Sequence, residues 1–120
     1  EQVGILTIYS NIVTVDLSKA QSFICTATDD ISGFRLYNIP SESTSFTIKM
    51  SQDGTGSRAV GIDTFYVGGG STFPVYWPGG VVPVVTTTAS RTDIYSFKIF
   101  DGTNVSTVGM YGIVGGQNFA

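Results

Sequence analysis

The sequence predicts an all-β fold, an antiparallel β-sandwich that is jelly-roll-like or a flattened barrel, with little or no helix. Three observations predict it. Apolar and polar residues alternate along most of the chain, which is the period of a strand with one buried face. Glycine, proline and Asp-Gly pairs interrupt this alternation at short intervals, as they do where strands reverse direction. No stretch of about ten or more residues carries a 3.6-residue period with capping residues at its ends.

The alternation places the strands along the chain. We expect them at residues 4–9, 12–17, 21–28, 32–37, 44–50, 59–67, 73–77, 84–88, 93–100 and 106–114. The clearest are "IVTVDL", "STSFTIKM" and "TDIYSFKIF". Their inward positions are Val13, Val15, Leu17, Phe46, Ile48, Met50, Tyr95, Phe97 and Ile99. A short helix in "DLSKAQSF", capped by Asp16, is the alternative to an extended chain in that stretch.

Turn residues separate these strands. The G-x-G in "QDGTGSRAVGID" resembles a phosphate-binding loop, but no helical period follows Gly56 and position 59 is alanine. We therefore interpret this stretch as a turn between strands, in which Gly54 and Gly56 adopt backbone conformations that a side chain would oppose. The Gly/Pro-rich stretch "GGGSTFPVYWPGGVVP" holds large aromatic side chains, so we expect a packed loop or an edge strand there.

Size and charge limit the class of protein. The 120 residues fit one domain, residues 1–120, that buries enough surface to fold alone. Six basic residues against nine acidic ones give a net charge of −3, so we expect neither nucleic acid nor a membrane as a partner. No apolar run is long enough to span a bilayer, and no secretion signal is visible. The single cysteine, Cys25, excludes a disulfide framework and is predicted to be buried and inert.

The residues offer little chemistry. The chain has no histidine, which removes the commonest general base, the commonest zinc ligand and every Ser-His or Cys-His pair. The acidic pairs and turns at Asp29-Asp30, Asp53 and Asp101 lack the spacing of a calcium loop, and turn carboxylates usually bind their own backbone. We therefore expect no catalytic residues, no cofactor and no metal site.

Five residues are candidates for contact with a partner, each with a structural alternative. Arg58 and Arg91 are the polar candidates. For Arg58 the favoured alternative is an ion pair with a carboxylate across its own turn, because a ligand-binding arginine needs a concave site that the sequence does not show. Tyr76 and Trp77 are apolar anchors or a core plug beneath the Pro-Gly loop. Phe119, close to the end of the sequence, docks either on its own sheet or on a neighbour.

Four stretches in order resemble a known module. They are "QDGTGSR" at residues 52–58, "WPGGVVPVVT" at 77–86, "DIYSF" at 93–97 and "YGIVGGQNFA" at 111–120, and in this order they are similar to a module of virion structural proteins in tailed bacteriophages, notably those that infect cyanobacteria and other marine bacteria. The resemblance covers about residues 44–120. It departs from the family pattern where "FYVGGGSTFPVY" is inserted before Trp77.

The resemblance implies a protein of the virion exterior and no catalysis. The first expectation is a capsid decoration or cement protein that binds the major capsid protein or other virion subunits, as a homo-oligomer with a trimer favoured. The alternative is a tail fibre or spike domain, a trimer that presents loops such as residues 68–73 to a host glycan. A small carbohydrate-active enzyme or lectin is the third hypothesis, and it requires a carboxylate pair or an aromatic platform on one face.

Overall fold

The computed structural model describes residues 2–120, and most of their regular structure is β. The strands are β1 (Val3–Leu6), β2 (Ile8–Tyr9), β3 (Ile12–Asp16), β4 (Ser22–Ala27), β5 (Gly33–Tyr37), β6 (Thr44–Gln52), β7 (Phe65–Val67), β8 (Thr72–Phe73), β9 (Val75–Tyr76), β10 (Thr92–Ile99) and β11 (Met110–Phe119). Within this part of the chain the helical turns are the 3₁₀ turn η1 (Pro78–Gly80) and the short helix α1 (Val105–Val108). The prediction of an all-β fold with little helix is confirmed.

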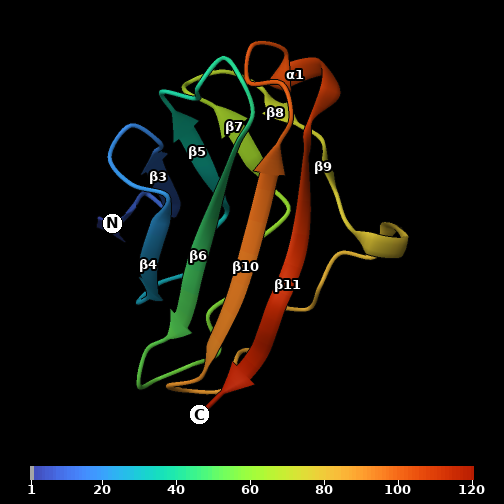
Figure 1. Ribbon diagram of the computed structural model, residues 1–120. Helices are drawn as coiled ribbons and strands as arrows, with labels where there is room; N and C mark the ends of the chain where they lie inside the picture. Colours follow the sequence, from blue (N-terminus) through green and yellow to red (C-terminus); the bar gives the residue numbers. More distant parts are fainter. Residues whose placement is uncertain (1) are drawn as a thin grey trace.

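The strands form two sheets that pack face to face (Figure 1). Sheet A has the order β1-β4-β6-β10-β11-β9, and sheet B has the order β2-β3-β5-β7-β8. The buried apolar residues of both sheets belong to one cluster, in which Phe65 of sheet B meets Phe97 of sheet A with ring centroids 5.0 Å apart. All of the inward positions predicted for the three clearest strands are buried, and so is Cys25.

The antiparallel pairing predicted for the sandwich is wrong for much of the molecule. β1, β4 and β6 are parallel neighbours in sheet A, and β3, β5 and β7 are parallel neighbours in sheet B. Parallel neighbours need a long crossover connection. Here each connection runs through the opposite sheet, because the chain alternates between the two sheets from β3 to β7. For example, β3 and β5 of sheet B are connected through β4 of sheet A. Antiparallel pairing holds for β6-β10-β11 and for the short pairs β2-β3 and β7-β8.

Several predicted elements differ from the observed ones. Residues 84–88 form no strand, and only the last part of the predicted strand 59–67 is one. The predicted strand 106–114 starts later, after α1, and extends to Phe119. No helix forms in "DLSKAQSF", because the Asp16 carboxylate accepts hydrogen bonds from Ser18 N, 2.9 Å, and Ser18 Oγ, 2.6 Å, and closes a turn instead. The bonds from Ser18, together with one from Asn38 Nδ2, 2.9 Å, lower the pKa of Asp16 to about 2.

The "QDGTGSR" stretch is a turn, as predicted, but it leads from β6 toward the opposite sheet. The Asp53 carboxylate accepts hydrogen bonds from Thr55 N and Gly56 N, 3.1 and 2.9 Å. Gly56 has a φ of +72°, and a Cβ there would lie 2.8 Å from Ala89 N. The role predicted for Gly54 is wrong, because its φ is not positive and a Cβ there would meet no atom within 4 Å.

A buried carboxylate on β10 accepts hydrogen bonds from the C-terminal strand and from the loop that precedes β10, and so connects the two. Asp93 is 1% exposed, and Oδ2 accepts hydrogen bonds from Tyr95 OH, 2.7 Å, and Thr86 N, 2.8 Å. Gln117 Nε2 also donates to Oδ2, 3.2 Å, while Asn118 N donates to Oδ1, 2.9 Å. Burial by itself raises the pKa of Asp93, but these donors outweigh it and hold the pKa below its usual value. Residues 84–88 are held by bonds outside the sheet ladders, since Thr86 N donates to Asp93, Val84 O accepts from Gln117 Nε2, 2.7 Å, and Thr87 O accepts from Ser57 N, 2.7 Å.

Candidate functional site

The clearest surface for contact is a group of exposed apolar side chains at the β9 edge of sheet A. We call it the aromatic patch. Its members are Tyr76, Phe100, Val108, Tyr111 and Ile113, which are 46, 64, 43, 50 and 54% exposed. Scattered exposed apolar residues are ordinary on a soluble protein, but adjoining ones mark an interaction surface more often.

Strand register and two close ring contacts build the aromatic patch. β9 and β11 pair in parallel with Tyr76 opposite Tyr111, and their ring centroids are 5.3 Å apart. Gly109 makes room for this arrangement, since a Cβ there would lie 3.0 Å from Tyr76 Cε2. Phe100 meets Tyr111 edge to face at 5.7 Å. The rings therefore support one another in fixed positions, which lowers the entropy cost of presenting them to a partner.

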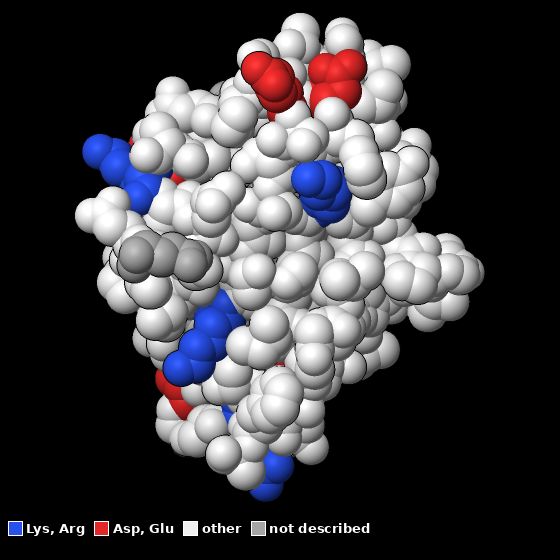
Figure 2. All heavy atoms as spheres, in the orientation of Figure 1, with Lys and Arg blue, Asp and Glu red and all other residues white. Residues whose placement is uncertain are grey.

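A shallow depression of about 430 Å³ extends the aromatic patch along the outer face of sheet A. Its lining is Ser45, Ser96, Phe97, Lys98, Phe100, Tyr111 and Ile113. Lys98 Nζ lies 5.5 Å from the centre of the Phe100 ring and 3.3 Å from Ser43 Oγ, so the one charge in this lining is held against an aromatic ring. Figure 2 shows that charged side chains are sparse and separated on the face it views.

An uncharged arm adjoins the aromatic patch. The arm, residues 78–84, projects from the body of the molecule beside β11 in Figure 1. Its side chains Val81, Val82 and Val84 are 69, 42 and 86% exposed. No charged residue occurs anywhere between Asp63 and Arg91 in the sequence. The arm therefore offers apolar area without charges that a partner would have to desolvate.

The structure corrects the contact hypothesis for Trp77. The side chain is 7% exposed and lies in the core, edge to face with Phe97 at 5.7 Å and Tyr95 at 6.5 Å. It packs so closely on β11 that a Cβ at Gly112 would lie 2.6 Å from the indole ring. A partner has no access to the ring. Trp77 therefore fills the core beneath the Pro-Gly loop, as the structural alternative predicted. Its neighbour Tyr76 points to the opposite side, as alternation requires.

The other three candidates lie away from the aromatic patch. Arg58 Nη2 is 2.9 Å from Asp53 Oδ2, so it makes the ion pair across its own turn that the structural alternative predicted. The hydrogen bond from Arg58 is the largest of the causes that lower the pKa of Asp53 below its usual value. Arg91 Nη1 donates to Asn118 Oδ1, 3.2 Å, beside the half-exposed Phe119. Phe119 docks on its own sheet opposite Thr92, about 27 Å along β11 from Tyr111 at the rise of a strand.

Sequence reasoning missed Phe100, Val108, Tyr111 and Ile113 as surface residues. A signal was present for two of them. Phe100 comes directly after the inward Ile99, so a large apolar side chain stands at an outward position where the pattern calls for a polar one. Tyr111 lies between the buried residues Met110 and Gly112, so it also occupies an outward position. Large apolar side chains at outward positions of a strand are the feature that identifies such a patch.

The acidic side chains of the described residues do not gather into a metal site. Within residues 2–120 no three acidic or cysteine side chains come together as ligands. The Asp29, Asp53 and Asp101 carboxylates accept hydrogen bonds from backbone N–H groups within three residues, as expected of turn acids. The 68–73 loop, predicted to face a glycan in a fibre, exposes Gly69, Gly70 and Ser71 at its tip and offers no ring there.

Comparisons with known proteins add no identification. A scan against protein-family models, a search of curated proteins and a search of solved structures each found no match. Among residues 2–120 no helix has the length and apolar character to cross a membrane.

Proposed function

We propose that this chain is a structural protein of the virion exterior in a tailed bacteriophage, and that it acts as a capsid decoration protein. It works by binding, without catalysis and without a cofactor. The observation that supports this function best is the aromatic patch continued by the uncharged arm, because both present ordered apolar surface on one edge of the molecule. The order of the four family-like stretches in the sequence supports the same assignment.

The size of the aromatic patch indicates how the binding works. From the exposed fractions of its five residues, its exposed area is on the order of 500 Å², most of it apolar. A standard stable interface buries about 800 Å² on each partner, so one such patch holds its partner weakly. Several copies that bind together raise the effective concentration of each contact. We therefore propose a homo-oligomer, a trimer first, whose patches engage neighbouring capsid subunits together and resist their separation.

The test is binding to capsids that lack their accessory proteins, from the phage that encodes this chain. We expect saturable binding at a ratio that matches the capsid lattice, and a shell that survives heating to a higher temperature. Tyr111→Ser and Phe100→Ser should each weaken binding about tenfold or more, as central aromatic contacts do. Tyr9→Ser is the matched control, because Tyr9 is 84% exposed on sheet B.

Each variant must first unfold thermally like the parent protein, so that a loss of binding reports on contact. Absence of saturable binding by the parent protein would reject the decoration role. If the same preparation is a stable trimer that retains a glycan, the fibre or spike domain takes its place.

A further inference from the structure

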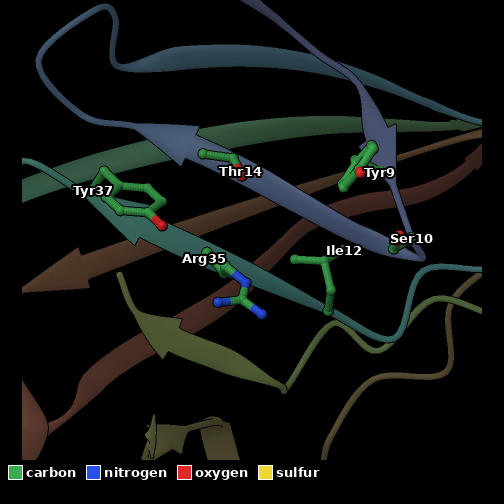
Figure 3. Close-up of a pocket in the computed structure, with 6 residues that line it drawn as sticks. All are labelled: Tyr9, Ser10, Ile12, Thr14, Arg35 and Tyr37. Carbon is green, nitrogen blue, oxygen red and sulfur yellow. The ribbon is translucent and has the colours of Figure 1, made fainter. Parts of the chain in front are cut away.

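The outer face of sheet B carries a groove that the proposed function does not use. Its volume is about 380 Å³, and its lining is Tyr9, Ser10, Ile12, Thr14, Arg35 and Tyr37. Figure 3 shows these side chains on β2, β3 and β5 and on the turn between β2 and β3. The groove lies on the sheet opposite to the one that bears the aromatic patch.

The strand register fixes Arg35 in the middle of this face. Thr14 lies opposite Arg35 on β3, and Tyr66 lies opposite it on β7. The Arg35 guanidinium carbon is 5.4 Å from the centre of the Tyr66 ring. That ring covers Gly33, where a Cβ would lie 3.0 Å from Tyr66 Cε2. The guanidinium group is thus supported by an aromatic ring beneath it.

The charge of Arg35 is not neutralised by a partner. Its guanidinium makes no hydrogen bond and no ion pair with any of residues 2–120. The nearest acid on this face by strand register is Asp16, which pairs with Tyr37, and its Oδ1 accepts hydrogen bonds from Ser18 and Asn38 instead. A half-buried guanidinium with free donors is suited to a carboxylate, which it binds through two parallel hydrogen bonds.

The tyrosines on either side set the length and the chemistry of a ligand. Tyr9 pairs with Ile12 and Tyr37 pairs with Asp16. Their backbone positions are therefore about 13 Å apart along the strands and about 10 Å apart across them. Tyr9 and Tyr37 are 84 and 40% exposed. Thr14 lies between them, and Ser10 lies beyond Tyr9 in the turn between β2 and β3 (Figure 3). Aromatic rings that alternate with hydroxyl groups offer apolar faces and hydrogen bonds over the length of a short oligosaccharide.

We propose that this groove binds a short saccharide that carries a carboxylate. Arg35 pairs with the carboxylate, the rings of Tyr9 and Tyr37 pack on the C–H faces of sugar rings, and Thr14 binds a sugar hydroxyl. A peptide is a poorer fit, because an open groove of this kind has no deep pocket for a side-chain anchor. The proposal does not depend on binding to a capsid.

The test is titration calorimetry of the purified protein with 3′-sialyllactose and with oligogalacturonate, and with lactose as the neutral partner. We expect saturable binding of at least one acidic sugar and at least about tenfold weaker binding of lactose. Arg35→Gln should lower the affinity about tenfold or more through loss of the charged hydrogen bonds. Tyr37→Ala should also weaken it, whereas Arg91→Gln, a change of the same charge away from the groove, should leave it unchanged.

Two results would overturn this assignment. One is the absence of saturable binding by either acidic sugar up to about 10 mM, a concentration that covers weak single-site affinities. The other is binding that survives Arg35→Gln in a protein that unfolds like the parent. Because capsid binding is measured separately with changes in the aromatic patch, failure of the proposed function leaves this test intact.

Discussion

Replacement of Asp93 by asparagine tests whether one buried carboxylate holds the C-terminal strand and the 84–91 segment together. The variant keeps the shape of the side chain but exchanges one acceptor oxygen for an NH₂ group. If the remaining oxygen faces Tyr95 OH and Thr86 N, the new NH₂ group faces Asn118 N, and two donors then oppose each other. No rotation of the amide satisfies all of these donors.

The expected loss of stability follows from those contacts. An unsatisfied buried donor costs about 1–3 kcal/mol. A hydrogen bond to the charged carboxylate contributes about 1.5–3 kcal/mol, whereas a hydrogen bond to the neutral amide that replaces it contributes about 1 kcal/mol. We expect Asp93→Asn to lower the free energy of unfolding by about 3–5 kcal/mol, a large share of the usual total for a domain.

Urea unfolding followed by Trp77 fluorescence measures this change. Trp77 is the only tryptophan in the chain, and it is buried 6.5 Å from Tyr95, so its emission reports on this part of the core. Asp63→Asn is the control, because Asp63 is exposed and should change the unfolding midpoint little. A loss below about 1 kcal/mol for Asp93→Asn would refute the reasoning, since it would equal an ordinary surface hydrogen bond.

Two further predictions follow from close packing and from the acidic groups. Gly112→Ala places a methyl group within 2.9 Å of three atoms of the Trp77 indole, so we expect a loss of about 1–3 kcal/mol in urea unfolding and a shift in fluorescence emission. Gly54→Ala, with no atom within 4 Å, is its control, and equal losses in both would contradict the packing argument. Stability should also be constant between about pH 5 and pH 7 and fall in acid, because carboxylates with a lowered pKa lose their favourable contacts as the pH drops through their folded-state pKa. The groups concerned are Asp16, Asp53, Asp93 and Asp101. Thermal unfolding between pH 7 and pH 2 measures this dependence, and Asp93→Asn should flatten it; the same acid slope in the variant would exclude Asp93 as a contributor.

The burial of strand residues was predictable, whereas the pairing of the strands was not. Alternation identifies the inward face of "STSFTIKM" regardless of which strand lies beside it, so Phe46, Ile48 and Met50 were placed correctly. A turn that reverses the chain within a sheet and a turn that carries it to the opposite sheet use the same glycine and aspartate residues. The turn after Asp53 is of the second kind, and its local hydrogen bonds are those of an ordinary Asx turn.

The surface was predictable in part. Tyr76 was a candidate and lies in the aromatic patch, but the adjacent Trp77 could not be assigned to the core without knowledge of Gly112, which lies far away in sequence and makes room for the indole. The groove on sheet B escaped prediction for a related reason. Tyr9, Arg35 and Tyr66 come from three strands. The antiparallel β2-β3 pair and the parallel register of β3, β5 and β7 together bring them to one face.

The alternation of the chain between the sheets also determines how the protein can begin to fold. Where β1, β4 and β6 lie side by side, about 20 residues or more separate each pair of partners along the sequence, as in Val3 opposite Ser22 and Ser22 opposite Thr47. No local hairpin can nucleate this part, and closing such loops slows folding. On the ribosome, the first half of the chain would emerge without its closing partners, since β6 gains its second neighbour only when β10 appears. We therefore expect the nascent chain to stay protease-sensitive until β10 and β11 have been synthesised.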